Sequence, residues 1–371
     1  MELDSLLAQM IERSASDLHL AAGVPPVFRV GGDLITARKP TPPADIIEAS
    51  RLGGYVGTAP EEVPNLTPEA LDALLQAALP ADKLAGARQG RDFSATLRHA
   101  DRAFRCRVFR ERGRLAAAVR ILPDRIPSIY DLHLPPVLET LTHYKSGLIL
   151  LTGPTGSGKT TTLVSLVEHI NLNRAERICT VEDPMHYFLR TRLSLVTQRV
   201  VGEDVESYEC GLLSVMDADP DVILIGELRT PETARLALEL VETGHLVFSQ
   251  MTADTAADAL ARLVGMLGEP CDLARCLVAR TVRAVIAQNL LRREDSPGRV
   301  AANEILITTP RVRQMIADGQ TDASLLALAM EASHRFGMQT MDESLLGLHA
   351  SGAISRESAE AHLKEKGRLE G

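Results

Sequence analysis

The residues from Gly153 to Thr160 could bind a nucleoside triphosphate, because they read GPTGSGKT and fit the pattern G-x-x-x-x-G-K-[ST]. The apolar run GLILLT precedes them and TTTLVSLVEHI follows, which predicts a strand, a loop and a helix. Gly153 and Gly158 allow backbone turns that aim N–H groups at phosphate. We expect Lys159 to reach the β and γ phosphates of ATP and Thr160 to bind Mg²⁺. The other predicted nucleotide contacts are Pro154, Thr155, Gly156, Ser157 and Thr161.

Carboxylates follow two further apolar runs. RICTVED ends in Glu182 and Asp183, and DVILIGE ends in Glu227. Ligands of open α/β sheets bind at the carboxyl ends of the strands, so these acids are expected near the same nucleotide. We assign activation of the attacking water to Glu182, and the Mg²⁺ shell to Glu227 and Asp183 together with Thr160. The alternative is that they are ordinary exposed acids at strand ends.

Arginines are concentrated in a short segment before the nucleotide motif: Arg102, Arg105, Arg107, Arg110, Arg112 and Arg114. Three interpretations are open. The segment could be a solvated strand face, or a nucleic-acid patch, which is weakly supported because only Phe104 and Phe109 are interleaved as stacking residues. The third interpretation is that one or two of these arginines reach a nucleotide bound by the neighbouring domain or subunit and stabilise transition-state charge.

The elements around these residues predict an α/β protein with two domains. From residue 137 to 308, apolar strands alternate with helices, which is typical of a parallel sheet covered on both faces. Residues 1–123 show a helix over 3–11, a helix over 67–86 with Thr67 as its N-cap, and short alternating strands of an antiparallel sheet. A proline-rich linker is expected at 124–136, a loop or insertion at 40–66, and a helical segment at 309–371.

Composition excludes several classes of protein. The chain has 371 residues, 45% hydrophobic and 24% charged, and a formal charge of −9, which argues against a surface built to coat nucleic acid or anionic lipid. Its five cysteines form no C-x-x-C pair, so neither a disulfide framework nor a zinc site is supported. No stretch approaches the roughly 18 apolar residues of a membrane span. We expect a cytoplasmic protein that binds no nucleic acid and meets a membrane only through partners.

The order and spacing of several motifs resemble the hexameric type IV pilus retraction ATPases of the PilT/PilU type. The similar segments are ASDLHLAAGVPPVFRVGGDL, GPTGSGKTTTL, VEDP, PDVILIGELR, ETGHLVF and FGMQTMDESLLGLHASGAIS. The resemblance implies a PAS-like α+β N-terminal domain, a RecA-like P-loop ATPase core and a helical C-terminal segment. It also implies a homo-hexamer at the pilus base that acts on an inner-membrane platform protein and drives pilin subunits back into the inner membrane, with a paralogous retraction ATPase as a further partner.

The resemblance also assigns roles to single residues. It identifies Glu182 and Asp183 with the Asp box and Glu227 with the Walker B glutamate. His245 matches the first histidine of the His box, and Arg105 and Arg120 match arginines that reach nucleotide across the subunit boundary.

Three positions depart from the family pattern. His186 replaces an acid in EDPMH, Asp217 stands where the family has an arginine, and Thr252 replaces the second His-box histidine. If all three surround the γ phosphate, hydrolysis is expected to be slow, which favours an accessory, PilU-like role.

Three functions are therefore weighed: a motor that powers pilus retraction and twitching motility, a weakly hydrolysing structural subunit beside an active paralogue, and an ATPase of pilus assembly or type II secretion. The third is disfavoured, because its usual tetracysteine element has no counterpart here.

Overall fold

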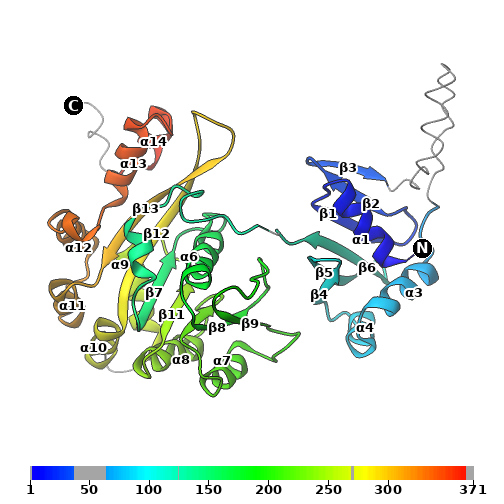
Figure 1. Cartoon of the computed structure of the whole chain (residues 1–371), viewed down its shortest axis with the longest axis horizontal. Coiled ribbons are helices and arrows are strands. Elements are labelled where there is room, and N and C mark those ends of the chain that lie inside the picture. The colour runs from blue at the N-terminus through cyan, green and yellow to red at the C-terminus, as the bar shows by residue number, and fades with distance from the viewer. Residues whose placement is uncertain (1, 37–63, 124, 269–270, 365–371) are drawn as a thin grey trace. The chain divides into compact units, whose positions relative to one another are not determined.

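The computed structural model describes residues 2–36, 64–123, 125–268 and 271–364. The chain divides into two compact units, residues 1–124 and 125–371 (Figure 1). The segment expected as a linker, 124–136, belongs almost entirely to the second unit, and Ile129 and Leu134 are buried in its core. The insertion expected at 40–66 lies almost wholly outside the described residues.

The first unit is an antiparallel sheet with helices packed on it. Its strands lie in the order β3-β2-β1-β6-β5-β4. Their core contains Leu7, Leu75 and Phe104, each buried. The bounds are α1 (Leu3–Glu12), β1 (Asp17–Ala21), β2 (Val27–Val30), β3 (Asp33–Thr36), α3 (Pro68–Ala78), α4 (Ala81–Arg88), β4 (Phe93–His99), β5 (Arg102–Glu111) and β6 (Arg114–Ile121).

One helix prediction in this unit needs correction. The segment 67–86 forms two helices, α3 and α4, rather than one. Thr67 caps α3 as expected, since its hydroxyl accepts from the Ala70 amide at 3.1 Å. The helix ends because Pro80 lacks an N–H and pushes the preceding Leu79 into an extended conformation, φ −129° and ψ 150°.

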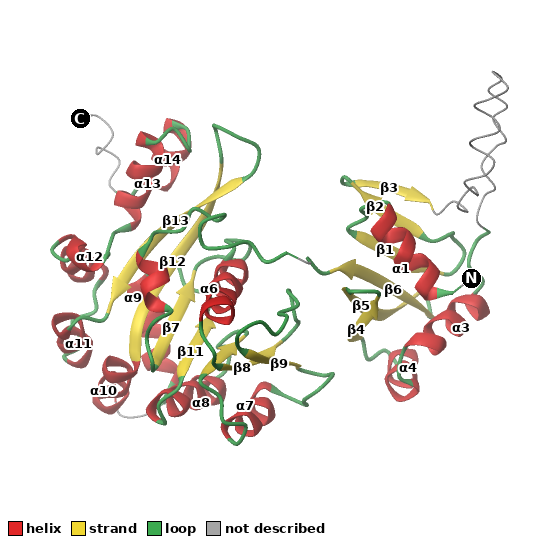
Figure 2. Ribbon diagram, viewed as in Figure 1, coloured by secondary structure: helices red, strands yellow, loops and turns green. Residues whose placement is uncertain are grey.

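The second unit is built on a sheet of order β13-β12-β7-β11-β10-β8-β9 (Figure 2). All neighbouring strands are parallel except β12 and β13, which form an antiparallel hairpin that the sequence reasoning did not identify. The bounds up to that hairpin are α5 (Val137–Leu141), β7 (Gly147–Thr152), α6 (Lys159–Asn173), β8 (Arg177–Glu182), β9 (Leu195–Val200), α7 (Tyr208–Met216), β10 (Val222–Ile225), α8 (Pro231–Glu242), β11 (Leu246–Gln250), α9 (Ala256–Met266), α10 (Cys271–Thr281), β12 (Val282–Arg292) and β13 (Arg299–Ile307).

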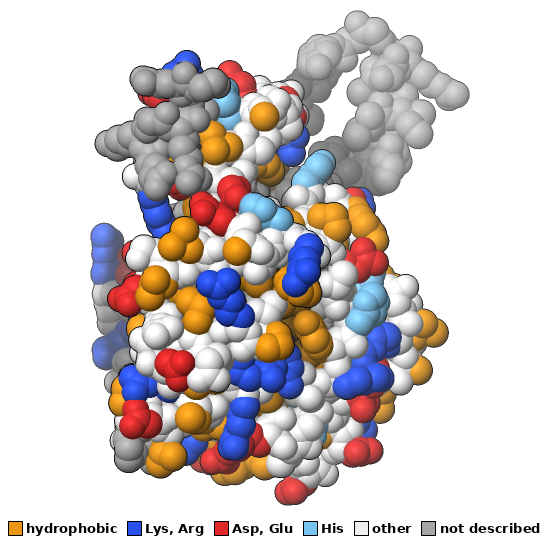
Figure 3. All heavy atoms as spheres, turned by 90° about the vertical axis from the view of Figure 1, so that its left-hand side faces the viewer, with side chains coloured by type: hydrophobic (Ala, Val, Ile, Leu, Met, Phe, Trp, Pro, Cys, Tyr) orange, Lys and Arg blue, Asp and Glu red, His pale blue; other side chains and the backbone are white. Residues whose placement is uncertain are grey.

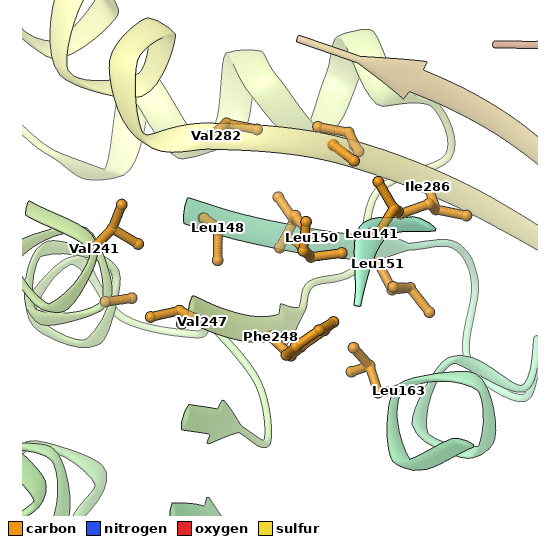
Figure 4. Packing of buried hydrophobic residues seen from close by; sticks show 14 of the residues in the cluster. Leu141, Leu148, Leu150, Leu151, Leu163, Val241, Val247, Phe248, Val282 and Ile286 are labelled. Carbon is orange, nitrogen blue, oxygen red and sulfur yellow. The ribbon is translucent and has the colours of Figure 1, made fainter. Parts of the chain in front are cut away.

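The predicted apolar strands form the centre of this sheet. Every residue of β7 is buried, as expected where helices cover both faces. Figure 4 shows Leu150 of β7 between Phe248 of β11 and Ile286 of β12, with Leu163 of α6 close by. This core fixes the carboxyl ends of the strands, where the candidate residues lie.

The C-terminal part is helical, as the sequence predicts. It contains α11 (Pro310–Ala317), α12 (Ala323–Glu331), the 3₁₀ turn η1 (His334–Phe336), α13 (Met341–Ala350) and α14 (Arg356–His362). Gly337 turns the chain after η1 with φ +80°, and a Cβ there would lie 2.5 Å from the Val137 side chain. Figure 3, which views the side that lies at the left in Figure 1, shows basic, acidic and hydrophobic side chains interspersed. Within the described residues, no helix combines the length and the apolar character needed to cross a membrane.

Candidate nucleotide-binding site

The loop between β7 and α6 has the backbone geometry of a phosphate cradle. Gly153, Gly156 and Gly158 have φ values of +141°, +83° and +85°, a region that favours glycine. At Gly153 an added Cβ would also lie 2.3 Å from the backbone oxygen of Gln288. The N-terminus of α6 begins at Lys159, so its free N–H groups point toward the loop. The predicted strand, loop and helix are therefore present.

Gln288 of β12 supports this loop, and the sequence analysis missed it. Its side-chain oxygen accepts from the Thr162 hydroxyl at 2.9 Å, and its amide nitrogen donates to the Ser157 carbonyl at 2.6 Å. The side chain is buried, so both halves of the amide are used in the protein interior. No sequence signal marks this residue, because its role follows from the pairing of β12 with β7.

A pocket of about 610 Å³ opens beside the loop. The predicted residues among its lining are Thr155, Gly156, Gly158, Lys159, Thr160, Thr161 and Glu227. Further lining comes from Asp131, Leu132, His133 and Leu134, which lie in the segment expected as a linker, and from Gln250, Arg229, Leu290, Arg299 and Ala301. Gln250 ends β11 at the same edge as the acids, so the strand-end argument that selected the acids could also have found it.

Lys159 is positioned to meet an anion in this pocket. Its ammonium group donates to the carbonyls of Gly153 and Pro154, both at 2.8 Å. Burial lowers the pKa of Lys159, while the negative charge of Glu227 raises it in part. A phosphate would add a charged acceptor for a cation that now has only neutral ones.

The residues present fit a magnesium ion bound together with a nucleotide. Thr160 presents its hydroxyl 3.3 Å from the side-chain amide of Gln250, and Glu227 presents a carboxylate in the same pocket. Hydroxyl and carboxylate oxygens suit Mg²⁺. Among the described residues no cluster of three or more His, Cys, Asp or Glu side chains is placed to hold a metal by itself.

Glu227 makes two contacts at the edge of the sheet. It accepts from the Arg229 guanidinium at 2.8 Å and from the Thr252 hydroxyl at 3.4 Å. The hydrogen bond to Glu227 raises the pKa of Arg229. Thr252 and His186, two of the three departures from the family pattern, thus line the pocket as expected.

Glu182 lies at the end of β8, is buried, and is not among the residues that line the pocket. One carboxylate oxygen accepts from the Thr180 hydroxyl at 2.7 Å and from the Gln198 amide at 3.0 Å. Burial raises the pKa of Glu182, and these hydrogen bonds counteract it only in part. Its role in water activation stays a prediction.

The neighbouring Asp183 is exposed and does not line the pocket either, so the structure gives no support to its assignment as a metal ligand.

Two of the expected phosphate neighbours lie at the opposite edge of the sheet. The carbonyl of His245 accepts from the amide of Gly147, the first residue of β7, while the loop that binds phosphate follows the last. The His245 ring contacts the Leu240 carbonyl at 2.8 Å. Asp217 follows α7 and precedes β10, and so lies at the same far edge. We therefore correct both expectations: neither residue joins the pocket of its own chain, because a strand separates each from the carboxyl edge.

The predicted arginines lie on the sheet of the first unit. Arg105 of β5 pairs with Arg120 of β6, which pairs with Asp17 of β1. Arg120 donates to Asp17 at 2.7 Å. Burial and the positive charges of Arg120 and Arg107 lower the pKa of Arg105. Asp17 thus forms an ion pair with Arg120, and its negative charge offsets part of the lowering of the Arg105 pKa. Their predicted action on a neighbouring subunit's nucleotide stays a prediction.

Comparison with known proteins agrees with this geometry. The family model described as "Type II/IV secretion system protein" matches residues 131–360. The type IV pilus retraction ATPase PilT of Pseudomonas aeruginosa is 34% identical over 98% of both chains. PilU, a type IV pilus ATPase of the same organism, is 32% identical over 98% of this chain and 88% of its own length. The crystal structure of the pilus retraction motor PilT with bound ADP superimposes with a TM-score of 0.83 at 32% identity, and covers 100% of this chain and 99% of that one.

The phosphate cradle, the acids at the carboxyl edge and this match along nearly the whole chain lead to one assignment. The chain belongs to the type II/IV secretion system protein family and, within it, to the type IV pilus retraction ATPases.

Proposed function

We propose that the chain binds ATP with Mg²⁺ in the pocket beside the β7–α6 loop and hydrolyses it. The loop amides and Lys159 bind the β and γ phosphates, while Thr160 and Glu227 hold the metal's coordination shell. Mg²⁺ would neutralise charge on the transferring phosphoryl group. Glu182 takes the proton of the attacking water, a role that its raised pKa supports.

We further propose that hydrolysis powers retraction of type IV pili. The observation that carries this proposal is the similarity to PilT along 98% of both chains, combined with the glycine geometry of the loop. In this proposal six copies form a ring at the cytoplasmic face of the inner membrane and act on the pilus platform protein. Arg105 and Arg120 of one copy reach the nucleotide of the next.

A second candidate is a slowly hydrolysing subunit that assists an active paralogue. It is favoured by Thr252 and His186, which line the pocket where the family pattern has a histidine and an acid. The Thr252 hydroxyl donates to Glu227 and is neutral, so it cannot bring the positive charge of a protonated histidine to the transferring phosphate. An assembly or secretion ATPase remains the least supported alternative.

The test is a turnover measurement on the purified chain, alone and mixed with a paralogue from the same cell. A second measurement follows pilus retraction in cells that carry either the wild-type chain or the Lys159→Ala variant in place of their own copy. A sole motor hydrolyses ATP alone and restores retraction. An accessory subunit stimulates the paralogue and has little turnover of its own. Normal retraction with Lys159→Ala as the only copy would overturn the sole-motor form, and failure of the wild-type chain to stimulate the paralogue would overturn the accessory form.

A further inference from the structure

Glu304 of β13 is a buried carboxylate that the proposed chemistry does not use. It is only 5% exposed and lines a cavity of about 190 Å³ formed with residues of α9, α12 and α13. One of its oxygens accepts from the backbone amide of Ala256 at 2.8 Å. Ala256 is the first residue of α9, where an amide lacks a partner within the helix and a negative charge is favourable.

The other oxygen of Glu304 connects to the end of the described chain. It lies 3.6 Å from the ammonium group of Lys364. The backbone amide of Lys364 in turn donates to Asp342 in the first turn of α13 at 3.1 Å. Glu304 therefore connects the start of α9 to α13 and to the residues after α14.

The segment before α9 carries a residue of the nucleotide pocket. Thr252 donates to Glu227, and its own carbonyl accepts from Arg262 of α9 at 2.7 Å. The carbonyl of Ala253 accepts from Thr152 at the end of β7, also at 2.7 Å. Segment 251–256 is thus held by side chains from β7, α9 and β13, and the contact with Glu304 leads on to Lys364 and α13.

We propose that Glu304 is a positioning residue that fixes segment 251–256, so that the placement of Thr252 beside Glu227 depends on the C-terminal helices. The inference rests on the proposed role of this pocket in ATP hydrolysis. Removing the acceptor leaves a buried amide unsatisfied, and segment 251–256 loses its fixed point at the start of α9.

The experiment measures amide hydrogen exchange of the full-length chain without nucleotide, together with steady-state turnover and ADP affinity. Glu304→Met keeps the side-chain length but removes the acceptor. It should speed exchange in peptides spanning 251–256 about tenfold and lower kcat by roughly tenfold, with ADP affinity within about twofold of wild type. Glu304→Gln keeps the acceptor for the Ala256 amide but loses the charge that faces Lys364, so it should change both values much less than Glu304→Met does. Lys364→Gln should produce a smaller increase in exchange at the same peptides.

Glu331→Gln is the matched control, since Glu331 lines the same cavity from α12. It should leave exchange at 251–256 unchanged. If Glu304→Met does not fold, Glu304→Asp can be used in its place. It should also speed exchange at 251–256, because the shorter side chain cannot reach the Ala256 amide. Exchange at 251–256 equal to wild type, or equally fast in the Gln and Met variants, would overturn the proposal. If Lys364→Gln leaves exchange at 251–256 unchanged, the proposed link from Glu304 to the C-terminal helices is wrong. Because exchange is measured without hydrolysis, absent ATPase activity would count against the proposed function alone.

Discussion

Two regions of the molecule carry residues that we expect to contact a nucleotide. One is the carboxyl edge of the second unit's sheet, and the other is the sheet of the first unit. They differ in whether a single chain brings together all the groups that each site needs. At the carboxyl edge, glycines, Lys159 and Glu227 surround a pocket within one chain. On the first unit, Arg105 and Arg120 lie side by side on adjacent strands, and Arg120 pairs with Asp17. The first region brings the groups that would bind phosphate together within one chain, whereas the arginines of the second are proposed to act on the nucleotide of a neighbouring subunit. We therefore expect ATP binding to depend on the pocket of the second unit. Turnover should depend on assembly, because it needs the arginines of the first unit.

The largest effect is expected from Lys159→Ala. This change removes the cation inside the loop, and a charge-assisted hydrogen bond contributes about 1.5–3 kcal/mol. Loss of contacts to two phosphates should weaken ATP binding by roughly a hundredfold or more, measured by titration calorimetry. Lys145→Ala is the control, because Lys145 is an exposed lysine that pairs with Glu176. Near-normal affinity of Lys159→Ala would remove the basis for the pocket assignment.

Glu182→Gln should separate binding from turnover. The amide keeps the volume of the side chain but cannot take a proton, so turnover should fall by about 10² to 10⁴ while ATP affinity changes little. In the wild type, kcat should decline toward acid pH with an apparent pKa above the usual 4.5 of a glutamate, because burial raises the pKa of Glu182 and activity needs the ionised form. A pH–rate profile of both chains measures this. An acid limb that persists unchanged in residual Glu182→Gln activity would assign it to another group.

The comparison between the two regions predicts complementation between subunits. Lys159→Ala chains keep the arginines, and Arg105→Ala chains keep the pocket, so mixed assemblies should recover turnover that neither variant has alone. Arg107→Ala is the control, because Arg107 is exposed on the same strand and pairs with Asp92. ATPase activity is measured across mixing ratios. Activity no greater than the sum of the separate variants would mean that Arg105 does not act across a subunit boundary.

The smallest effect is expected at the positions that depart from the family pattern. Thr252→His places a ring that can carry a proton beside Glu227, and a donor to developing charge contributes about 2.7–4 kcal/mol in favourable cases. We expect turnover to rise about tenfold without tighter ATP binding. Asp217→Arg, at the opposite edge of the sheet, serves as the control and should change neither value. An increase in turnover with Asp217→Arg would show that this residue acts on the site of another subunit.

Much of the architecture follows from local patterns in the sequence. The apolar runs of β7, β8, β10 and β11 and the glycine spacing fix the cradle and the edge at which Glu227 and Gln250 lie. The order of the motifs did not predict correctly where His245 and Asp217 lie. Both precede a strand, so they lie at the edge of the sheet opposite the phosphate-binding loop. Long-range pairings gave no local signal. Gln288 supports the loop only through the register of β12 with β7. The residues from 131 to 134 line the pocket, although the prolines on either side of them, Pro127, Pro135 and Pro136, suggested a linker.

The contact of Gln288 with the phosphate-binding loop has a consequence for synthesis of the chain. Ser157 emerges from the ribosome 131 residues before its partner. A nascent chain that ends before β12 contains the full nucleotide motif, yet it lacks the amide that holds the Ser157 carbonyl and the strand that pairs with β7. The complete support of the phosphate-binding loop therefore forms only after β12 has been synthesised and has paired with β7.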